Sequence, residues 1–108
     1  MSAFDQLERL AAEIAAKASA SPEISYTAKL LHQGIEKCAK KFGEEAVELA
    51  LAAVAGRQGE ATKEAADVLY HLLVLLRASG ISPDEVMAEL KRREGTSGIA
   101  EKAARKDD

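Results

Sequence analysis

Five acidic residues are spaced so that their side chains can act together. Glu44, Glu45 and Glu48 open the run GEEAVELALAAVAG, and Glu64 and Asp67 lie in a second apolar stretch. Glu45 and Glu48 are three residues apart, as are Glu64 and Asp67, so each pair meets on one side of a helix. Two such pairs on facing helices would repel each other unless a multivalent cation lay between them. The spacing therefore predicts a cation site between two helices.

The residue types favour magnesium as this cation. Mg²⁺ prefers oxygen ligands, and it usually keeps some water while substrate phosphates supply further oxygens. Zinc or copper would be expected to draw in histidine or cysteine. Di-iron bundles use Glu-x-x-His, whereas His71 follows Asp67 by four residues and no acid precedes it by three. We therefore expect Mg²⁺ and no di-iron centre.

The residues around Asp67 help to distinguish a cation-binding site from an acidic stripe on a solvated helix face. Val68, His71 and Leu75 share its side of the helix, so we expect that side to be at least partly enclosed. An enclosed carboxylate is costly without a partner, which favours a site over surface decoration. His71 and the neighbouring Tyr70 are possible ligand contacts, and core packing is the alternative for both.

Basic residues precede the acids in the chain. Lys37, Lys40 and Lys41 project from the same broad side as Glu44 and Glu48, one to two turns nearer the amino end. One interpretation is ion pairing along a solvated helix face. The other is that these lysines receive phosphate oxygens that extend away from the metal.

Apolar residues recur at three- and four-residue intervals, which is the pattern of amphipathic helices. The four helices expected from it cover residues 3–20, 27–55, 60–79 and 83–93. At ~1.5 Å per residue the second would be ~43 Å long. Residues 94–108 are polar, and they form either a loop followed by a short helix or a mobile tail that orders on binding.

Glycine, serine and proline mark the ends of these helices. Gly56 suits a left-handed cap after the second helix, and Gly80 ends the third. Ser82, Pro83 and Glu85 form a start signal, since they supply a capping serine, a proline at the first helical position and a capping-box glutamate.

The composition indicates a single all-α domain over residues 1–108. Hydrophobic residues make up 47% and charged residues 31%, while two prolines and 4% aromatic residues argue against a turn-rich β architecture. The net charge of -3 offers no general attraction to nucleic acid or to an anionic membrane. Cys38 is alone, and the amino terminus MSAFDQLERL has no basic region followed by an apolar stretch. We expect a cytoplasmic protein without nucleic-acid or membrane partners.

Four segments of the chain resemble those of one enzyme family. They are SYTAKLL at 25–31, KKFGEEAVE at 40–48, EAADVLYHLLVLL at 64–76 and RREGTSGIAEKAARK at 92–106. The acidic pattern Glu-Glu-x-x-Glu followed by Glu-x-x-Asp is that of the MazG-like all-α nucleoside triphosphate pyrophosphohydrolases. The other segments resemble the phosphoribosyl-ATP pyrophosphatases of histidine biosynthesis within that superfamily.

The resemblance implies a four-helix bundle-like MazG-type fold, a homodimer and a single activity. That activity is Mg²⁺-dependent hydrolysis of the α–β phosphoanhydride of phosphoribosyl-ATP, which yields phosphoribosyl-AMP and pyrophosphate. The implied metal ligands are Glu45, Glu48, Glu64 and Asp67. Glu44 would assist a ligand or the attacking water, so the implied catalytic residues are Glu44, Glu45 and Glu48. The three lysines and Arg92 or Arg93 would add electrostatic help at the phosphates.

Two other functions remain open on the sequence. The first is a general pyrophosphohydrolase that clears noncanonical nucleoside triphosphates with the same acids. The second is a non-catalytic helical dimerisation module whose acids are surface decoration. A pathway-specific substrate separates the first from the family activity, and dependence on magnesium separates the second.

Overall fold

The computed structural model describes residues 2–95 and 98–105, and every regular element in these ranges is a helix. The helices are α1 (Asp5–Lys17), α2 (Tyr26–Gln33), α3 (Ile35–Val54), α4 (Gln58–Ser79), α5 (Pro83–Arg92) and α6 (Gly98–Ala104). The described residues contain no strand, so the predicted all-α class is confirmed.

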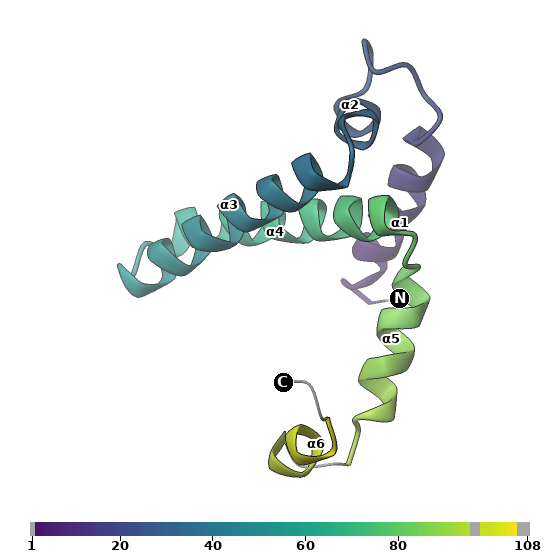
Figure 1. The fold of residues 1–108 in the computed structure, drawn as a ribbon. Helices are drawn as coiled ribbons and strands as arrows, with labels where there is room; N and C mark the ends of the chain where they lie inside the picture. The colour runs from purple at the N-terminus through teal and green to yellow at the C-terminus, as the bar shows by residue number, and fades with distance from the viewer. Residues whose placement is uncertain (1, 96–97, 106–108) are drawn as a thin grey trace.

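The two longest helices, α3 and α4, form an antiparallel hairpin and lie side by side (Figure 1). α1 and α2 pack at the end of the hairpin where α3 begins and α4 ends. The buried core lies at this end and draws on all four helices, through Ile14, Leu30, Cys38, Leu73 and Val74. This packing holds α3 against α4 and so sets which side chains face each other further along the hairpin.

Gly34 interrupts the helix predicted over residues 27–55. Its backbone has φ 100° and ψ 170°, a conformation that residues with a side chain rarely adopt. The chain changes direction there, so α2 and α3 are separate helices (Figure 1). The prediction of one long helix was wrong because the apolar repeat continues across residue 34 while the helical backbone does not. The thiol of Cys38 donates to the carbonyl oxygen of Leu30 at 3.3 Å, which ties the two helices across the break.

The predicted helix ends are confirmed elsewhere. Gly56 and Gly80 both have a φ of 74°, in the left-handed region, after α3 and α4 respectively. At the start of α5, Ser82 Oγ accepts from the backbone N–H of Asp84 at 3.0 Å, and Glu85 Oε2 accepts from the backbone N–H of Ser82 at 2.8 Å. These local signals therefore predicted the ends of α3 and α4 and the start of α5 correctly.

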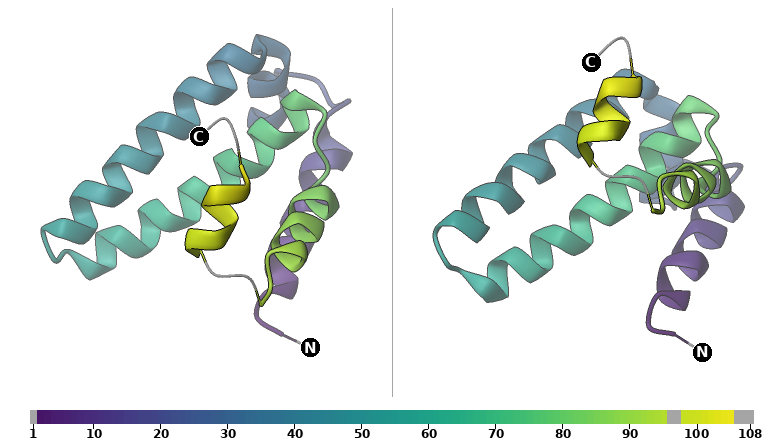
Figure 2. Two further views of the ribbon diagram at one scale, coloured as in Figure 1. Left: turned by 60° about the horizontal axis from the view of Figure 1, so that its bottom comes forward. Right: turned by 90° about the horizontal axis from the view of Figure 1, so that it is seen from below.

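α5 and α6 lie away from the α3–α4 hairpin in Figure 1, and α6 overlaps the hairpin in Figure 2 only because it is seen in front of it. The helix predicted over 83–93 does form, as α5, but α4 and α5 are bent by 104° relative to each other. The bundle-like body therefore consists of α1 to α4, with α5 projecting from it. α6 is a short helix, as in the first of the two alternatives given for residues 94–108, of which 96–97 and 106–108 lie outside the described residues. Among the described residues no single helix is long and apolar enough to cross a membrane, and only the bent α4–α5 pair meets that criterion jointly.

We predict that Gly34→Ala destabilises the protein by about 1–3 kcal/mol, because the backbone of an alanine is strained at this φ and ψ. A Cβ at residue 34 would meet nothing within 4 Å, so a clash does not contribute. Chemical unfolding followed by circular dichroism measures the change.

Gly43→Ala is the matched control. Gly43 lies inside α3, and a Cβ there also meets nothing within 4 Å. Alanine at residue 43 should stabilise the protein by up to about 1 kcal/mol, since glycine is a poor helix former. Equal unfolding free energies for the two variants would contradict the assignment of strain to Gly34.

Candidate active site

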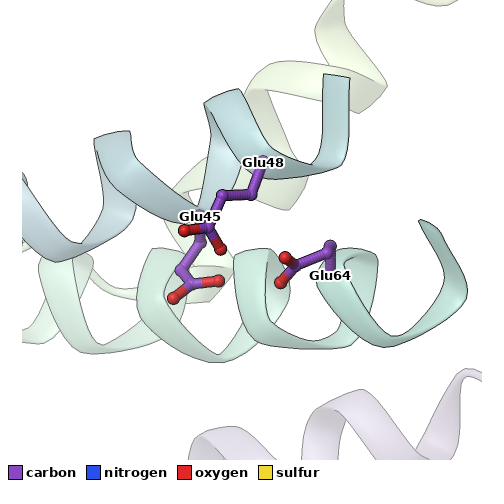
Figure 3. A group of neighbouring side chains, drawn as sticks. All are labelled: Glu45, Glu48 and Glu64. Atoms are coloured by element: carbon purple, nitrogen blue, oxygen red, sulfur yellow. The ribbon is translucent and has the colours of Figure 1, made fainter. Parts of the chain in front are cut away.

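Three acidic side chains from two helices converge near the middle of the hairpin. α3 carries Glu45 and Glu48, and α4 carries Glu64 (Figure 3). One carboxylate oxygen from each lies within 4.8 Å of the others. We call these three residues the acidic cluster. The antiparallel packing of α3 and α4 produces it, since Glu64 follows Glu48 by sixteen residues in the chain.

The acidic cluster is crowded with negative charge. Glu64 is half-buried, and hydrogen bonding to Glu48, burial and hydrogen bonding to Glu45 raise its pKa to about 7. Without a cation the cluster therefore relieves its repulsion by keeping a proton at neutral pH. Glu45 is also half-buried, and its Oε2 atom is buried without a hydrogen-bond partner. An all-oxygen donor set with one unsatisfied buried oxygen fits a hard divalent cation.

His71 lies on α4 beside the acidic cluster and is 6% exposed. Burial lowers the pKa of its imidazole, and the charge of Glu45 acts in the opposite direction. Its Nδ1 atom is buried without a hydrogen-bond partner, as is Glu45 Oε2. The ring of Tyr70 contacts His71 edge-on, with centroids 5.0 Å apart. His71 is therefore a buried, neutral imidazole on α4 beside the acidic cluster.

Two of the predicted acidic residues lie outside the cluster. Val68 and Leu75 are half-buried and His71 is buried, so this side of α4 is partly enclosed as expected, although Asp67 itself is exposed. It is close enough to His71 to raise the pKa of that imidazole. Glu44 is also exposed, and its carboxylate is paired with the ammonium of Lys41 at 3.7 Å. The structure thus brings together three of the five acids that the sequence singled out.

The predicted phosphate-binding residues fall into two groups. Lys37 and Lys40 are exposed on α3, while Lys41 is half-buried and close enough to His71 to lower the pKa of that ring. Arg92 and Arg93 belong to the carboxyl end of α5 and both bind Glu89, at 2.7 Å and 2.9 Å. These two contacts lower the pKa of Glu89 to about 2. The lysines lie on α3, as do Glu45 and Glu48, whereas the arginines lie at the carboxyl end of α5, which projects from the hairpin (Figure 1).

Comparisons with known proteins show the family of this chain. The family model described as phosphoribosyl-ATP pyrophosphohydrolase matches residues 7–94. A protein of Cereibacter sphaeroides named phosphoribosyl-ATP pyrophosphatase is 64% identical over 99 residues, which cover 92% of this chain and 96% of that protein. The chain belongs to the phosphoribosyl-ATP pyrophosphohydrolase family. Relatives with the same name in Dinoroseobacter shibae and Methylobacterium radiotolerans are 62% and 61% identical, over 92% and 93% of this chain and 97% and 94% of their own lengths.

Membership of the phosphoribosyl-ATP pyrophosphohydrolase family confirms the resemblance inferred from the sequence. The structure also contains a cavity between α1, α2 and α4 that Lys17, Tyr26, Thr27 and Tyr70 help to line. Tyr70 was expected as a possible ligand contact, and Tyr26 and Thr27 belong to the segment SYTAKLL, but no sequence pattern predicted that these segments meet.

The raised pKa of Glu64 predicts a pH-dependent stability for the metal-free protein. An acid with a raised pKa in the folded state adds stability at low pH, and this is lost as pH rises from its unfolded value of 4.5 through about 7. Glu64→Gln should therefore match the wild type in Tm at pH 5 and exceed it at pH 8. Thermal unfolding in chelator across this range measures the difference.

Glu60→Gln is the control for that series. Glu60 lies one turn earlier on α4, is exposed and pairs with Arg57 at 3.6 Å. The Tm of Glu60→Gln minus the Tm of the wild type should not increase between pH 5 and pH 8. A constant difference for Glu64→Gln over the same range would contradict charge crowding in the acidic cluster.

Proposed function

We propose that this chain hydrolyses the α–β phosphoanhydride of phosphoribosyl-ATP with the help of Mg²⁺. The products are phosphoribosyl-AMP and pyrophosphate, and the reaction is the second step of histidine biosynthesis. The observation that carries the metal dependence is the acidic cluster, whose carboxylate oxygens approach within 4.8 Å and include an unsatisfied buried oxygen of Glu45. As a biosynthetic enzyme acting on a soluble nucleotide, it would work in the cytoplasm, without nucleic-acid or membrane partners.

Glu45, Glu48 and Glu64 would hold the metal. Asp67 lies one turn after Glu64 on α4 and would complete the ligand set by turning its exposed side chain toward the cluster. Bound there, Mg²⁺ would polarise phosphoryl oxygens, lower the pKa of a coordinated water and offset charge on the departing pyrophosphate.

The neighbouring side chains would orient the substrate and the attacking water. Glu44 is exposed beside Glu45, and its carboxylate would accept a proton from the water once the substrate draws Lys41 away. Lys41 would then donate to a phosphate oxygen, with Lys37 and Lys40 further toward the amino end of α3. The buried imidazole of His71 would fix the orientation of Glu45 from behind.

We extend the proposal to a homodimer. The outer face of α3 carries Val47, Leu51 and Val54, which are 58%, 65% and 89% exposed. Their three- and four-residue spacing makes one contiguous apolar stripe, and such stripes mark interfaces between proteins. The stripe borders Glu48, so a second copy covering it would also shield the acidic cluster from water. Arg92 and Arg93 would reach the phosphates only in such an assembly, because α5 projects from its own chain.

Pyrophosphate release from phosphoribosyl-ATP tests the activity. We expect turnover with Mg²⁺, none in chelator, and a loss of about 100-fold or more in kcat/KM for Glu48→Ala, because an electrostatic stabiliser of the transition state is removed. ATP, dCTP and dUTP should be much poorer substrates.

The control for Glu48→Ala is Glu36→Ala, an exposed acid in the first turn of the same helix. It should keep nearly full activity. Turnover that needs no divalent ion, or full activity in Glu48→Ala, would refute the metal mechanism. Equal turnover of all four nucleotides would instead indicate a general pyrophosphohydrolase.

The dimer is tested by Leu51→Arg. A charge in the apolar stripe should weaken self-association by at least about 10-fold, which is the cost of disrupting a central contact. Light scattering coupled to size exclusion measures the mass at several concentrations. Phe4→Arg changes a residue that is 81% exposed outside the stripe and should leave the mass unchanged. A wild type that stays monomeric, or a Leu51→Arg variant that stays dimeric, would contradict this interface.

A further inference from the structure

A second site lies between α1, α2 and α4, apart from the acidic cluster. It is a cavity of about 280 Å³, and none of Glu45, Glu48 and Glu64 lines it. Its volume is at the low end for ligand pockets, which suits one part of a nucleotide rather than a whole one. The surrounding segments are the carboxyl end of α1, the residues that lead into α2, the first turn of α2 and Tyr70 of α4.

The wall of this cavity combines an aromatic face with hydroxyl groups. Thr27 is 6% exposed, and its Oγ1 shares a hydrogen bond of 2.6 Å with the hydroxyl of Tyr70. The ring of Tyr26 lies nearly parallel to that of Tyr70, with an interplanar angle of 18° and centroids 6.4 Å apart. Tyr26 remains 53% exposed, so it still offers surface to a planar base. The two hydroxyls are suited to ribose oxygens.

The edge of the cavity carries an ion pair. The ammonium of Lys17 is 2.7 Å from a carboxylate oxygen of Glu13, and both residues line the cavity. An ammonium has three donors, so further donors remain for an anionic ligand. The first turn of α2 also borders the cavity, and its backbone N–H groups add to the positive potential there. Lys17 and these N–H groups are the donors that a phosphate would meet at this corner, where it would compete with Glu13 for the ammonium.

Side-chain contacts link the cavity to the acidic cluster. Tyr70 lines the cavity and contacts His71 edge-on, and His71 is close enough to Glu45 for that carboxylate to raise the pKa of its imidazole. Tyr70 follows Glu64 on α4 by six residues, which is ~9 Å along the helix axis. A substrate of nucleotide length therefore reaches both places at once.

We propose that this cavity binds the ribose 5-phosphate group that the substrate carries on its purine. Tyr26 stacks against the base, the hydroxyls of Thr27 and Tyr70 meet the ribose, and Lys17 binds the terminal phosphate. The inference rests on the proposed function, since it assigns the non-reacting end of the same substrate. It explains how the protein distinguishes phosphoribosyl-ATP from ATP, because only the former has a group for this cavity.

Calorimetric titration with phosphoribosyl-AMP and with AMP tests the assignment without turnover. The wild type should bind phosphoribosyl-AMP at least about 10-fold more tightly than AMP, as expected for a charge-assisted contact to the extra phosphate. Lys17→Ala should bring this ratio toward one while the affinity for AMP stays the same. Tyrosine emission gives a second readout, because both tyrosines of the chain line the cavity and the chain has no tryptophan.

Two further variants separate binding from folding. Arg9→Ala removes a cation from α1 that bonds to Gln6 and does not line the cavity, and it should leave the ratio of affinities unchanged. Tyr26→Phe keeps the ring and should bind both ligands like the wild type, whereas Tyr26→Ala should weaken both.

An affinity ratio that Lys17→Ala does not change would overturn the inference, as would equal loss of both ligands in that variant. If the wild type still releases pyrophosphate from phosphoribosyl-ATP, the proposed function survives that result. Absence of any such hydrolysis would refute the proposed function, whatever the titrations give.

Discussion

Repulsion among carboxylates held between two packed helices is the interaction on which this molecule's chemistry depends. Glu45 and Glu48 on α3 and Glu64 on α4 are brought together by the packing of the hairpin. The protein relieves the crowding by a proton, which is why the pKa of Glu64 rises to about 7. The proposed divalent cation would relieve it further, because it would satisfy several oxygens together, including the buried oxygen of Glu45 that has no hydrogen-bond partner. Binding the metal and relieving the repulsion would then be one event.

The hairpin can bear this repulsion because its other end is firmly packed. Residues from α1, α2, α3 and α4 form the core there, and Cys38 bonds to the carbonyl of Leu30 across the break at Gly34. The same arrangement creates the cavity beside Thr27 and Tyr70. Core, cavity and acidic cluster therefore follow one another along the hairpin. In the proposed binding mode, a long nucleotide would be held at its base end near the core while its phosphates reach the acids.

A single chain leaves much apolar surface uncovered. The exposed stripe on α3 runs beside the acidic cluster, and α5 adds Met87 and Leu90, which are 52% and 54% exposed. Side chains of this kind seldom remain in contact with water over a continuous face. A second copy on α3 would also lower the local dielectric around the acids and so strengthen both their repulsion and their attraction for a cation. Assembly and catalysis would then share one surface.

Helix content, the acidic pairs and most helix ends could be predicted from the residues alone, because they depend on contacts within a turn or two of the chain. The i, i+3 spacing of Glu45 and Glu48 and the capping box at Ser82 are of this kind. The family could also be identified from the quoted motifs. The break at Gly34 was not predicted, since the apolar repeat continues across it and carries no information about the backbone angles of one residue. The outward position of Asp67 and the meeting of Lys17 with Tyr26 and Tyr70 came from the packing of helices distant in sequence. Their relative rotation and crossing depend on the whole core at once, and no local pattern encodes that.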